Sequence, residues 1–277
     1  MIQVEERYIS LLTDFGFKRI FGTAINKDLL ICFLNSLFDG KQVVKDVSYL
    51  NPEHVGDVYT DRKAIFDVYC EGENGEKFIV EMQNAYQTYF KDRSLFYSTF
   101  PIREQAALLN FDMNEEAFEK EKIRHSVQLC DTATHKVFYD KLEFIYVEIA
   151  KFNKSLEELE TLYDKWLYAL KNLYKLTQRP KELCDKVFDR LFEEAEIAKF
   201  TPQELREYEA SKIAYRDIKN SVDTAKRESI AEGMEKGMEK KSHEIAKKML
   251  TKGMDEATVM EITGLSAELI QQLKAEM

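Results

Sequence analysis

The chain has 277 residues, of which 44% are hydrophobic and 32% are charged, and its formal net charge is −10 at pH 7. This length and apolar content suffice for one sizeable core plus a smaller unit. The acidic balance argues against avid, non-specific DNA binding, because phosphate contacts normally come from Lys and Arg.

The spacing of the cysteines and the length of the apolar runs indicate the cellular compartment of the protein. The 4 cysteines lie far apart and form no CxxC pair, which argues against a disulfide or zinc framework and fits a reducing cytosol. No basic, apolar leader of the signal-peptide kind stands at the N-terminus. The longest apolar run, Leu29–Phe38, is too short to span a bilayer. We therefore expect a cytoplasmic protein with no membrane partner.

The N-terminal third begins with two predicted helices. Thr13 or Asp14 is placed to cap a helix that runs to Phe21. Lys27–Phe38 predicts a second helix, with a nearly continuous apolar face. Next come a strand (Lys41–Leu50), a hairpin (Ala64–Gln83) and a helix from Thr88 to about Leu109, kinked at Pro101.

Strands end near residue 153 and helices follow. Asn110–Lys122 is an acidic connection, and Arg124–Leu129 and Leu142–Ile149 predict two strands. Ser155 and Glu158 have capping-box spacing, and a broad apolar stripe follows that includes Trp166. We interpret this stripe as core rather than as a nucleotide-stacking surface. Two further helices are expected to start at Pro180 and Pro202.

The C-terminal segment is charged and helical. Ser221–Leu250 predicts a helix that contains Gly233 and Gly237, and their polar context favours a flexible helical linker over a membrane dimer motif. Asp255–Ile262 and Ser266–Lys274 predict two short helices joined by a glycine turn, as in a helix-turn-helix. The second offers Gln271, Gln272 and Lys274 for DNA contact, and a protein-docking hairpin is the alternative. The charged helix makes a homodimer a further expectation.

The hairpin IFDVYCEGENGEKFIVEMQ (Ile65–Gln83) allows two registers. A two-residue loop at Asn74-Gly75 would place apolar side chains opposite charged ones. A three-residue loop, with Gly75 in the left-handed conformation, gives one wholly apolar face. That register predicts the pairs Ile65–Gln83, Phe66–Met82, Asp67–Glu81, Val68–Val80, Tyr69–Ile79, Cys70–Phe78 and Glu71–Lys77.

The favoured register sets two carboxylates, Asp67 and Glu81, directly opposite each other. Like charges at this separation repel, with Cβ atoms about 5 Å apart, so the pair needs a cation, a raised pKa or screening water. Oxygen ligands of this kind suit Mg²⁺, and Gln83 lies on the same side and is able to orient a water molecule. The alternative is an exposed strand face whose acids lie in solvent.

Separated motifs give a more specific interpretation. The acids with Gln83 resemble the D…(D/E)-x-K site of PD-(D/E)xK nucleases, and the chain as a whole resembles the recombination-promoting nuclease/transposase family (PD-(D/E)xK nuclease family transposases). The matching segments are TDFGFKRIFG (Thr13–Gly22), LLICFLNSLF (Leu29–Phe38), VEMQ (Val80–Gln83), KDRSLFYSTFPIREQ (Lys91–Gln105), YDKW (Tyr163–Trp166) and ITGLS (Ile262–Ser266).

The resemblance implies a bacterial DNA endonuclease with an α/β core of αβββαβ type, a restriction-endonuclease-like mixed sheet flanked by helices, followed by an all-helical C-terminal region. It implies catalysis by Asp67, Glu81 and Gln83, with Mg²⁺ or Mn²⁺ held by Asp67 and Glu81. The family has Gln where most of the superfamily has Lys, so the positive charge that this lysine usually supplies is absent.

Other residues are candidates around this site. The resemblance suggests that Arg93 and Tyr97 face it, with Arg93 contacting a phosphate or Glu81, or else forming a structural ion pair. Asp14 either approaches the metal from the first helix or caps that helix, and we favour the cap. Candidate cations for the DNA backbone are Lys18, Arg19, Arg62, Lys63, Lys91, Arg93 and Arg103.

Two further expectations concern function and organisation. The chain lacks a segment that family members carry after Gln105. Its absence would reduce a sheet strand to Leu108–Phe111. The alternative function is therefore a catalytically inactive, transposon-derived module that binds DNA or protein. No glycine-rich phosphate loop occurs, so no nucleotide cofactor is expected. The 4 histidines lack ligand spacing. We expect a nuclease-like domain (1–153), a helical domain (154–220) and a linker with a helix-turn-helix-like hairpin (221–277).

Overall fold

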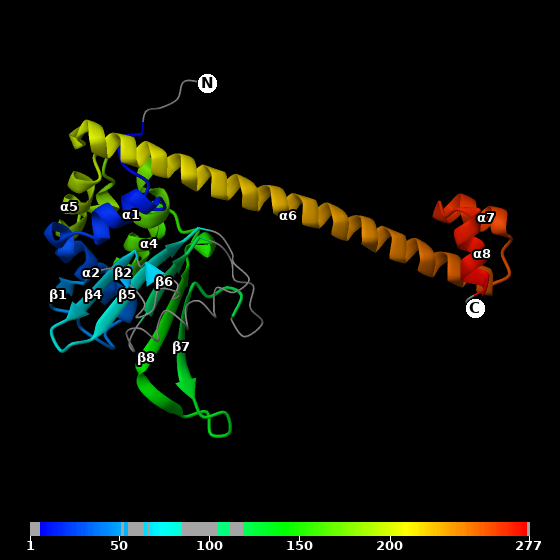
Figure 1. The fold of residues 1–277 in the computed structure, drawn as a ribbon, viewed down its shortest axis with the longest axis horizontal. Coiled ribbons are helices and arrows are strands. Elements are labelled where there is room, and N and C mark those ends of the chain that lie inside the picture. The colour runs from blue at the N-terminus through cyan, green and yellow to red at the C-terminus, as the bar shows by residue number, and fades with distance from the viewer. Residues whose placement is uncertain are drawn as a thin grey trace. The chain divides into compact units, whose positions relative to one another are not determined.

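A computed structural model describes residues 6–50, 53–54, 64–65, 67–84, 105–110 and 119–275. The chain divides into two compact units, Met1–Lys219 and Asn220–Met277. The first unit contains a mixed β-sheet and most of the helices, and the second contains most of one long helix and two short ones (Figure 1).

Two N-terminal helices match the sequence prediction. Helix α1 spans Asp14–Phe21, and the Thr13 side chain caps it by accepting a hydrogen bond from the Gly16 amide. The alternative cap, Asp14, is therefore wrong, because this carboxylate lies in the first turn. Helix α2 spans Lys27–Phe38 and ends as Asp39 adopts a left-handed conformation with φ of 51°.

The central sheet has six strands in the order β1–β4–β5–β6–β8–β7. The pairs β1–β4, β4–β5 and β7–β8 are antiparallel, whereas β5–β6 and β6–β8 are parallel. The bounds are β1 Val47–Tyr49, β4 Val68–Gly72, β5 Lys77–Gln83, β6 Gln105–Leu109, β7 Arg124–Cys130 and β8 Val137–Glu148. A separate two-stranded sheet pairs β2 (Glu53–His54) with β3 (Ala64–Ile65). The strand expected over Lys41–Leu50 is thus shorter than predicted.

The β4–β5 hairpin has the register that the burial pattern favoured. Val68 pairs with Val80 and Glu71 with Lys77, and the Gly72 amide donates to Glu76 O at 2.8 Å across a three-residue loop. Gly75 has a φ of 80°, as such a loop requires.

The expected ladder does not continue past Val68. Ile65 pairs with Glu53 of β2 and not with Gln83, and Asp67 lies at a bend just before β4. The Asp67 carboxylate accepts a hydrogen bond from the Met82 amide. If the β-ladder continued past Val68, this amide would instead donate to a main-chain carbonyl of the opposite strand. The predicted Phe66–Met82 pair lies outside the described residues.

Strand β6 corrects two expectations. Gln105–Leu109 is a strand and not the end of a helix, and it pairs in parallel with β5 on one side and β8 on the other. The sheet is therefore continuous where the sequence suggested a strand reduced to Leu108–Phe111. The rest of the predicted helix, from Thr88 to residue 104, lies outside the described residues.

Helices pack on one face of the sheet and enclose the main core. Trp166 of α4 (Leu162–Asn172) and Phe188 of α5 (Lys186–Glu194) are fully buried, in one cluster with Phe33, Val80 and Val147. The Trp166 ring lies against Phe33 and Phe188, which confirms its interpretation as a core residue. Short 3₁₀ turns occur at Ala24–Asn26, Ile149–Lys151, Leu156–Glu158, Leu173–Lys175, Lys181–Leu183 and Ile197–Lys199.

Two helix starts differ from the prediction. Ser155 and Glu158 do form a capping box, but it caps only a 3₁₀ turn, and α4 starts after a second box made by Thr161 and Asp164. Pro180 likewise precedes a 3₁₀ turn, and α5 starts at Lys186. Residues on both sides of position 153 contribute to the main core.

The C-terminal helices follow the sequence closely. Helix α6 spans Pro202–Thr251 without interruption, as predicted from Pro202 and from the charged stretch beyond Ser221. Helix α7 (Glu256–Thr263) is capped by Asp255 and ends at Gly264, which has a φ of 69°. Helix α8 spans Ala267–Ala275. A small core of its own joins α6, α7 and α8 through Ala246, Val259, Ile270 and Leu273.

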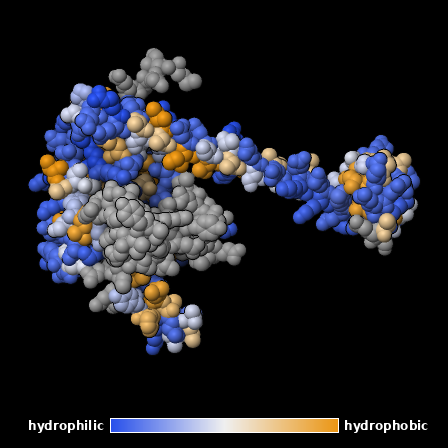
Figure 2. Space-filling model, viewed as in Figure 1, coloured by the Kyte–Doolittle hydropathy of each residue, from blue (hydrophilic) through white to orange (hydrophobic). Residues whose placement is uncertain are grey.

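The far end of the β7–β8 hairpin carries exposed apolar side chains, and Figure 2 shows hydrophobic residues gathered at the lower end of the view. Phe138 is 83% exposed, beside Leu129, Val137 and Tyr139. In the part of the chain that is described, no single helix has the length and apolar character needed to cross a membrane, although α1 with residues 24–38 passes that test as a pair bent by 64°.

Replacement of Gly75 by Ala tests the loop that sets the hairpin register. The left-handed conformation costs an alanine about 1–2 kcal/mol, so the midpoint of thermal unfolding should fall by several degrees. Differential scanning calorimetry measures this shift. Glu73→Ala, at an exposed position in the same loop, is the control and should change the midpoint by less than about 1 °C. An unchanged midpoint for Gly75→Ala would contradict the assigned loop.

Candidate active site

Asp67 lies where β4 begins and turns its carboxylate toward β5. Its Oδ2 accepts a hydrogen bond from the Met82 amide at 2.9 Å, and its Oδ1 lies 3.7 Å from Lys18 Nζ. The Asp67 side chain is 23% exposed. One oxygen of the carboxylate is thus bonded to the Met82 amide, and the other oxygen lies near the Lys18 cation.

Glu81 and Gln83 project from the sheet face opposite the main core. Val80 and Met82 belong to the main core, and side chains alternate along a strand, so the residues between and after them face the other side. Glu81 is only 4% exposed. Gln83 Nε2 donates to Glu81 Oε2 at 3.2 Å, which orients that carboxylate.

The protonation of Asp67 reflects its surroundings. Burial raises the pKa of the Asp67 carboxyl above its usual value, although the Met82 amide and the Lys18 charge oppose the rise. Burial lowers the pKa of Lys18, but its bond to Asp14 and the nearby Asp67 charge outweigh this effect, so the net shift is upward. Lys18 therefore stays charged beside the site.

Asp14 reaches the site indirectly. Its carboxylate forms an ion pair with Lys18 at 2.7 Å, one helical turn along α1. Lys18 thus lies between two acids, Asp14 and Asp67. Arg19, the neighbouring candidate, instead pairs with Glu204 and covers the Phe200 ring at 4.2 Å, so its contacts stabilise the packing of α6.

Hydrogen bonds fix the strand ends next to Gln83. The Asn110 amide donates to Gln83 O at 2.9 Å, and Asn110 Nδ2 donates to the Tyr215 hydroxyl of α6 at 3.1 Å. Asn84 Nδ2 donates to Leu12 O at 2.9 Å. The ends of β5 and β6 are therefore tied both to α6 and to the segment before α1.

A buried ionic group lies on the same sheet face. Cross-strand register aligns Gln83 with Leu109 and Leu109 with Glu148. Glu148 Oε1 lies 2.9 Å from His125 Nε2 and accepts a hydrogen bond from Lys151 at 2.8 Å. Spacing in the sequence did not reveal this group, because His125 and Glu148 meet only through the pairing of β7 with β8.

The donor set fits a hard divalent cation. Among the described residues, no group of three or more His, Cys, Asp or Glu side chains is placed to hold a metal ion. Mg²⁺, however, is commonly held by one or two carboxylates together with water and substrate phosphates. Asp67 and Glu81 are two largely buried carboxylates, and Asp67 is bonded to the amide of the residue after Glu81, so they match that smaller protein contribution.

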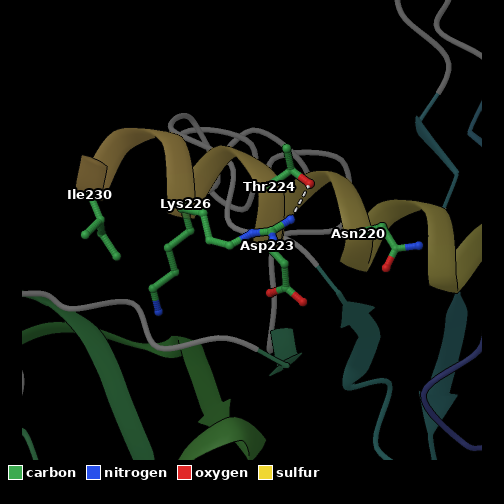
Figure 3. Close-up of a pocket in the computed structure, with 6 residues that line it drawn as sticks. Asn220, Asp223, Thr224, Lys226 and Ile230 are labelled. Atoms are coloured by element: carbon green, nitrogen blue, oxygen red, sulfur yellow. Dashed lines mark hydrogen bonds between the residues drawn. The ribbon is translucent and has the colours of Figure 1, made fainter. Parts of the chain in front are cut away.

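Other candidates lie elsewhere. Arg93, Tyr97 and Arg103 fall outside the described residues, as do Arg62, Lys63 and Lys91. The hollow in Figure 3 is lined by exposed side chains of α6 such as Asn220, Thr224 and Lys226, and the described residues around it include no catalytic group.

Comparisons with known proteins support the architecture. Residues 11–225 match the model of the PD-(D/E)XK nuclease family transposase, and residues 239–275 match that of the Rpn/YhgA-like nuclease family, C-terminal HTH domain. Neither a curated protein nor a solved structure matches the chain.

Asp67→Asn removes the charge of this side chain but keeps an oxygen that is able to accept the hydrogen bond from Met82. Because the pKa of Asp67 is raised by folding, the ionised group reduces stability above that pKa, and the cost disappears as pH falls through it. The Asn variant should therefore unfold about 2 °C higher at pH 7 without divalent metal, and should lose this advantage in acid. Melting curves from pH 3 to pH 8 measure the difference. A lower midpoint at pH 7 would contradict the assigned environment.

Proposed function

Because the chain belongs to the family of PD-(D/E)XK nuclease family transposases, we propose that it is a metal-dependent DNA endonuclease associated with recombination or transposition. Its substrate is the phosphodiester bond of DNA, and the cofactor is Mg²⁺ or Mn²⁺. The observations that support the proposal are two hydrogen bonds: the Asp67 carboxylate accepts from the amide of Met82, the residue after Glu81, and Gln83 donates to Glu81. A cytoplasmic location in a bacterial cell is part of the proposal.

Each residue has a distinct proposed role. Asp67 and Glu81 would hold the metal ion, and the Met82 amide keeps Asp67 turned toward β5. An ion held there would lower the pKa of a water molecule and stabilise the charge that develops on the phosphate. Gln83 orients the attacking water through its amide, while its bond to Glu81 holds that carboxylate in place. Lys18 supplies a positive charge 3.7 Å from Asp67, where a scissile phosphate needs one.

DNA binding is proposed to involve both units. The match over residues 239–275 to an HTH domain favours insertion of α8 into the major groove. Gln271 and Gln272 are the proposed base contacts. Lys274 forms an ion pair with Glu256 at 2.6 Å, so its phosphate contact requires that pair to open. Arg93 and Arg103 stay proposed backbone contacts, with Tyr97 as an accessory residue. A homodimer, which matches the two-fold symmetry of many DNA sites, completes the proposal.

Asp67→Ala tests the catalytic assignment. Loss of one metal-holding carboxylate should reduce Mg²⁺-dependent nicking of supercoiled plasmid on the order of 10³-fold, since a bound metal contributes several kcal/mol. Glu71→Ala is the matched control, because Glu71 lies on the same hairpin but pairs with Lys77 at 2.7 Å. This control should cleave as the unmodified chain does.

Equal nicking by Asp67→Ala and the unmodified chain would refute the assignment. Absence of nicking and of metal binding in the unmodified chain would instead favour the alternative, a catalytically inactive module that binds DNA or protein. Calorimetric titration with Mn²⁺ measures the metal binding, and the absence of both heat and a thermal shift on adding metal would favour the inactive module.

Tyr215→Phe tests whether the strand-end hydrogen bonds position Gln83. Removal of the hydroxyl leaves Asn110 without one partner, and we expect kcat for plasmid nicking to fall about 10-fold with little change in KM. Tyr208→Phe is the control. It also removes a hydroxyl of α6, but one that accepts from the Ser10 amide and donates to Glu6. Equal losses of kcat in both variants would contradict a positioning role for Tyr215.

A further inference from the structure

Strand β5 provides no positive charge at the candidate active site. Gln83 is neutral, and its Nε2 donates to Glu81 Oε2 at 3.2 Å. Lys77 lies at the other end of the strand, where it pairs with Glu71 at 2.7 Å. A phosphate gains negative charge as one of its ester bonds breaks, and a positioned cation stabilises that charge. The cation therefore has to come from another element.

Helix α1 brings one cation to the site. Lys18 Nζ lies 3.7 Å from Asp67 Oδ1, and no other cation of the described residues lies within 4 Å of this carboxylate. Arg19, the next residue, instead pairs with Glu204. The Lys18 side chain is 41% exposed, so an anion from solvent is able to reach its ammonium group. Lys18 is thus both close to the acids and accessible.

The fold fixes the place of α1 beside the end of β5. A Cβ added at Gly16 would collide with Ser10 O, so the first turn of α1 lies directly against the preceding main chain. Asn84, the residue after β5, donates to Leu12 O of the same preceding segment at 2.9 Å. The position of Lys18 relative to β5 is therefore set by main-chain packing and not by its own ion pair.

Asp14 draws Lys18 away from Asp67. Lys18 Nζ lies 2.7 Å from Asp14 Oδ1, which is hydrogen-bond distance, whereas 3.7 Å to Asp67 is longer than a hydrogen bond. Lys18 thus approaches Asp67 Oδ1 without closing on it. The Asp14 side chain is 65% exposed, and exposed pairs of this kind are weak, so an arriving phosphate is able to open the pair.

We propose that α1 supplies the positive charge that β5 lacks. Lys18 contacts the phosphate to be cleaved, and Asp14 is a positioning residue that keeps Lys18 from forming a close ion pair with Asp67. The phosphate contact rests on the proposed function, because it presupposes a DNA substrate. The part assigned to Asp14 does not depend on cleavage.

A purely structural role of the pair predicts different behaviour. If Asp14 and Lys18 only stabilised α1, loss of either side chain would affect the site in the same way. In the arrangement proposed, the two losses have opposite effects on metal affinity. Removal of Lys18 takes a positive charge away from Asp67, whereas removal of the Asp14 charge lets Lys18 close on Asp67 and compete with a divalent ion.

Calorimetric titration with Mn²⁺ and a crystal structure test the positioning role. The Kd for Mn²⁺ should fall about 3-fold in Lys18→Met and rise about 3-fold in Asp14→Asn, as expected for a partly screened charge. The double variant should bind as Lys18→Met does, because Asp14 acts through Lys18. In metal-free crystals of Asp14→Asn, Lys18 Nζ should lie about 2.8 Å from Asp67 Oδ1.

Cleavage and DNA binding test the phosphate contact. In Lys18→Met, kcat for plasmid nicking should fall about 10²-fold, and Lys18→Arg should keep most of the activity. The salt dependence of metal-free DNA binding should lose about one unit of slope in Lys18→Met and none in Lys18→Arg. Lys27→Met is the matched control, since Lys27 forms a similarly exposed pair with Asp46 at 2.7 Å, and it should change neither quantity.

Each outcome bears on one part of the proposal. Normal nicking and an unchanged salt slope in Lys18→Met would overturn the phosphate contact. A Lys18 that stays 3.7 Å from Asp67 in Asp14→Asn, or metal affinities that shift in the same direction in both single variants, would overturn the positioning role. An unmodified chain that binds Mn²⁺ and DNA without nicking would refute only the nuclease activity, and the titration, crystal and salt-slope results would still decide the roles of Lys18 and Asp14.

Discussion

The hydrogen bond from the Met82 amide to the Asp67 carboxylate is the interaction on which the rest of the candidate site depends, because it joins the start of β4 to the β5 residue that follows Glu81. Asp67 and Glu81 are both largely out of water, which is unfavourable for a carboxylate unless something offsets its charge. The Met82 amide and Lys18 each stabilise Asp67, and Gln83 donates to Glu81. Even so, the pKa of Asp67 stays raised, which is the condition that a divalent cation would relieve.

Main-chain hydrogen bonds hold the strands that carry these residues. A three-residue loop sets the register of β4 against β5, and β6 then aligns with β5 in parallel. Asn110 follows β6 and binds both Gln83 O and Tyr215. Helix α6 therefore reaches the strand ends beside the site. The apolar face of the same sheet packs on α1, α2, α4 and α5, so one sheet carries both the core and the chemistry.

Much of the hairpin could be predicted from sequence because burial and charge agree there. Only one register puts Val68, Cys70, Phe78 and Val80 on one face, and that register also pairs Glu71 with Lys77. Strand β6 was mistaken for helix because Ala and Leu favour helices and QAALL has no strand alternation. Its parallel pairing with β5 and β8, which decides its structure, involves residues far apart in the chain.

Other details of the structure depend on contacts between residues that sequence spacing does not reveal. Thr13 and Asp14 are both good caps, and the turn at Ser10 selects Thr13, whose hydroxyl donates to Ser10 O and accepts from Gly16. The association of His125 with Glu148 appears only when β7 pairs with β8. Lys18 is a predicted DNA contact, and its position between Asp14 and Asp67 could be seen only in the fold.

A crystal structure of the chain soaked in Mn²⁺, with data recorded at the manganese absorption edge, tests the central claim most directly. We expect an anomalous peak at coordination distance, about 2.1 Å, from one oxygen each of Asp67 and Glu81, with Gln83 facing a water on the ion. A map without a peak there, or with the ion bound to one acid while the other turns away from it, would contradict the account.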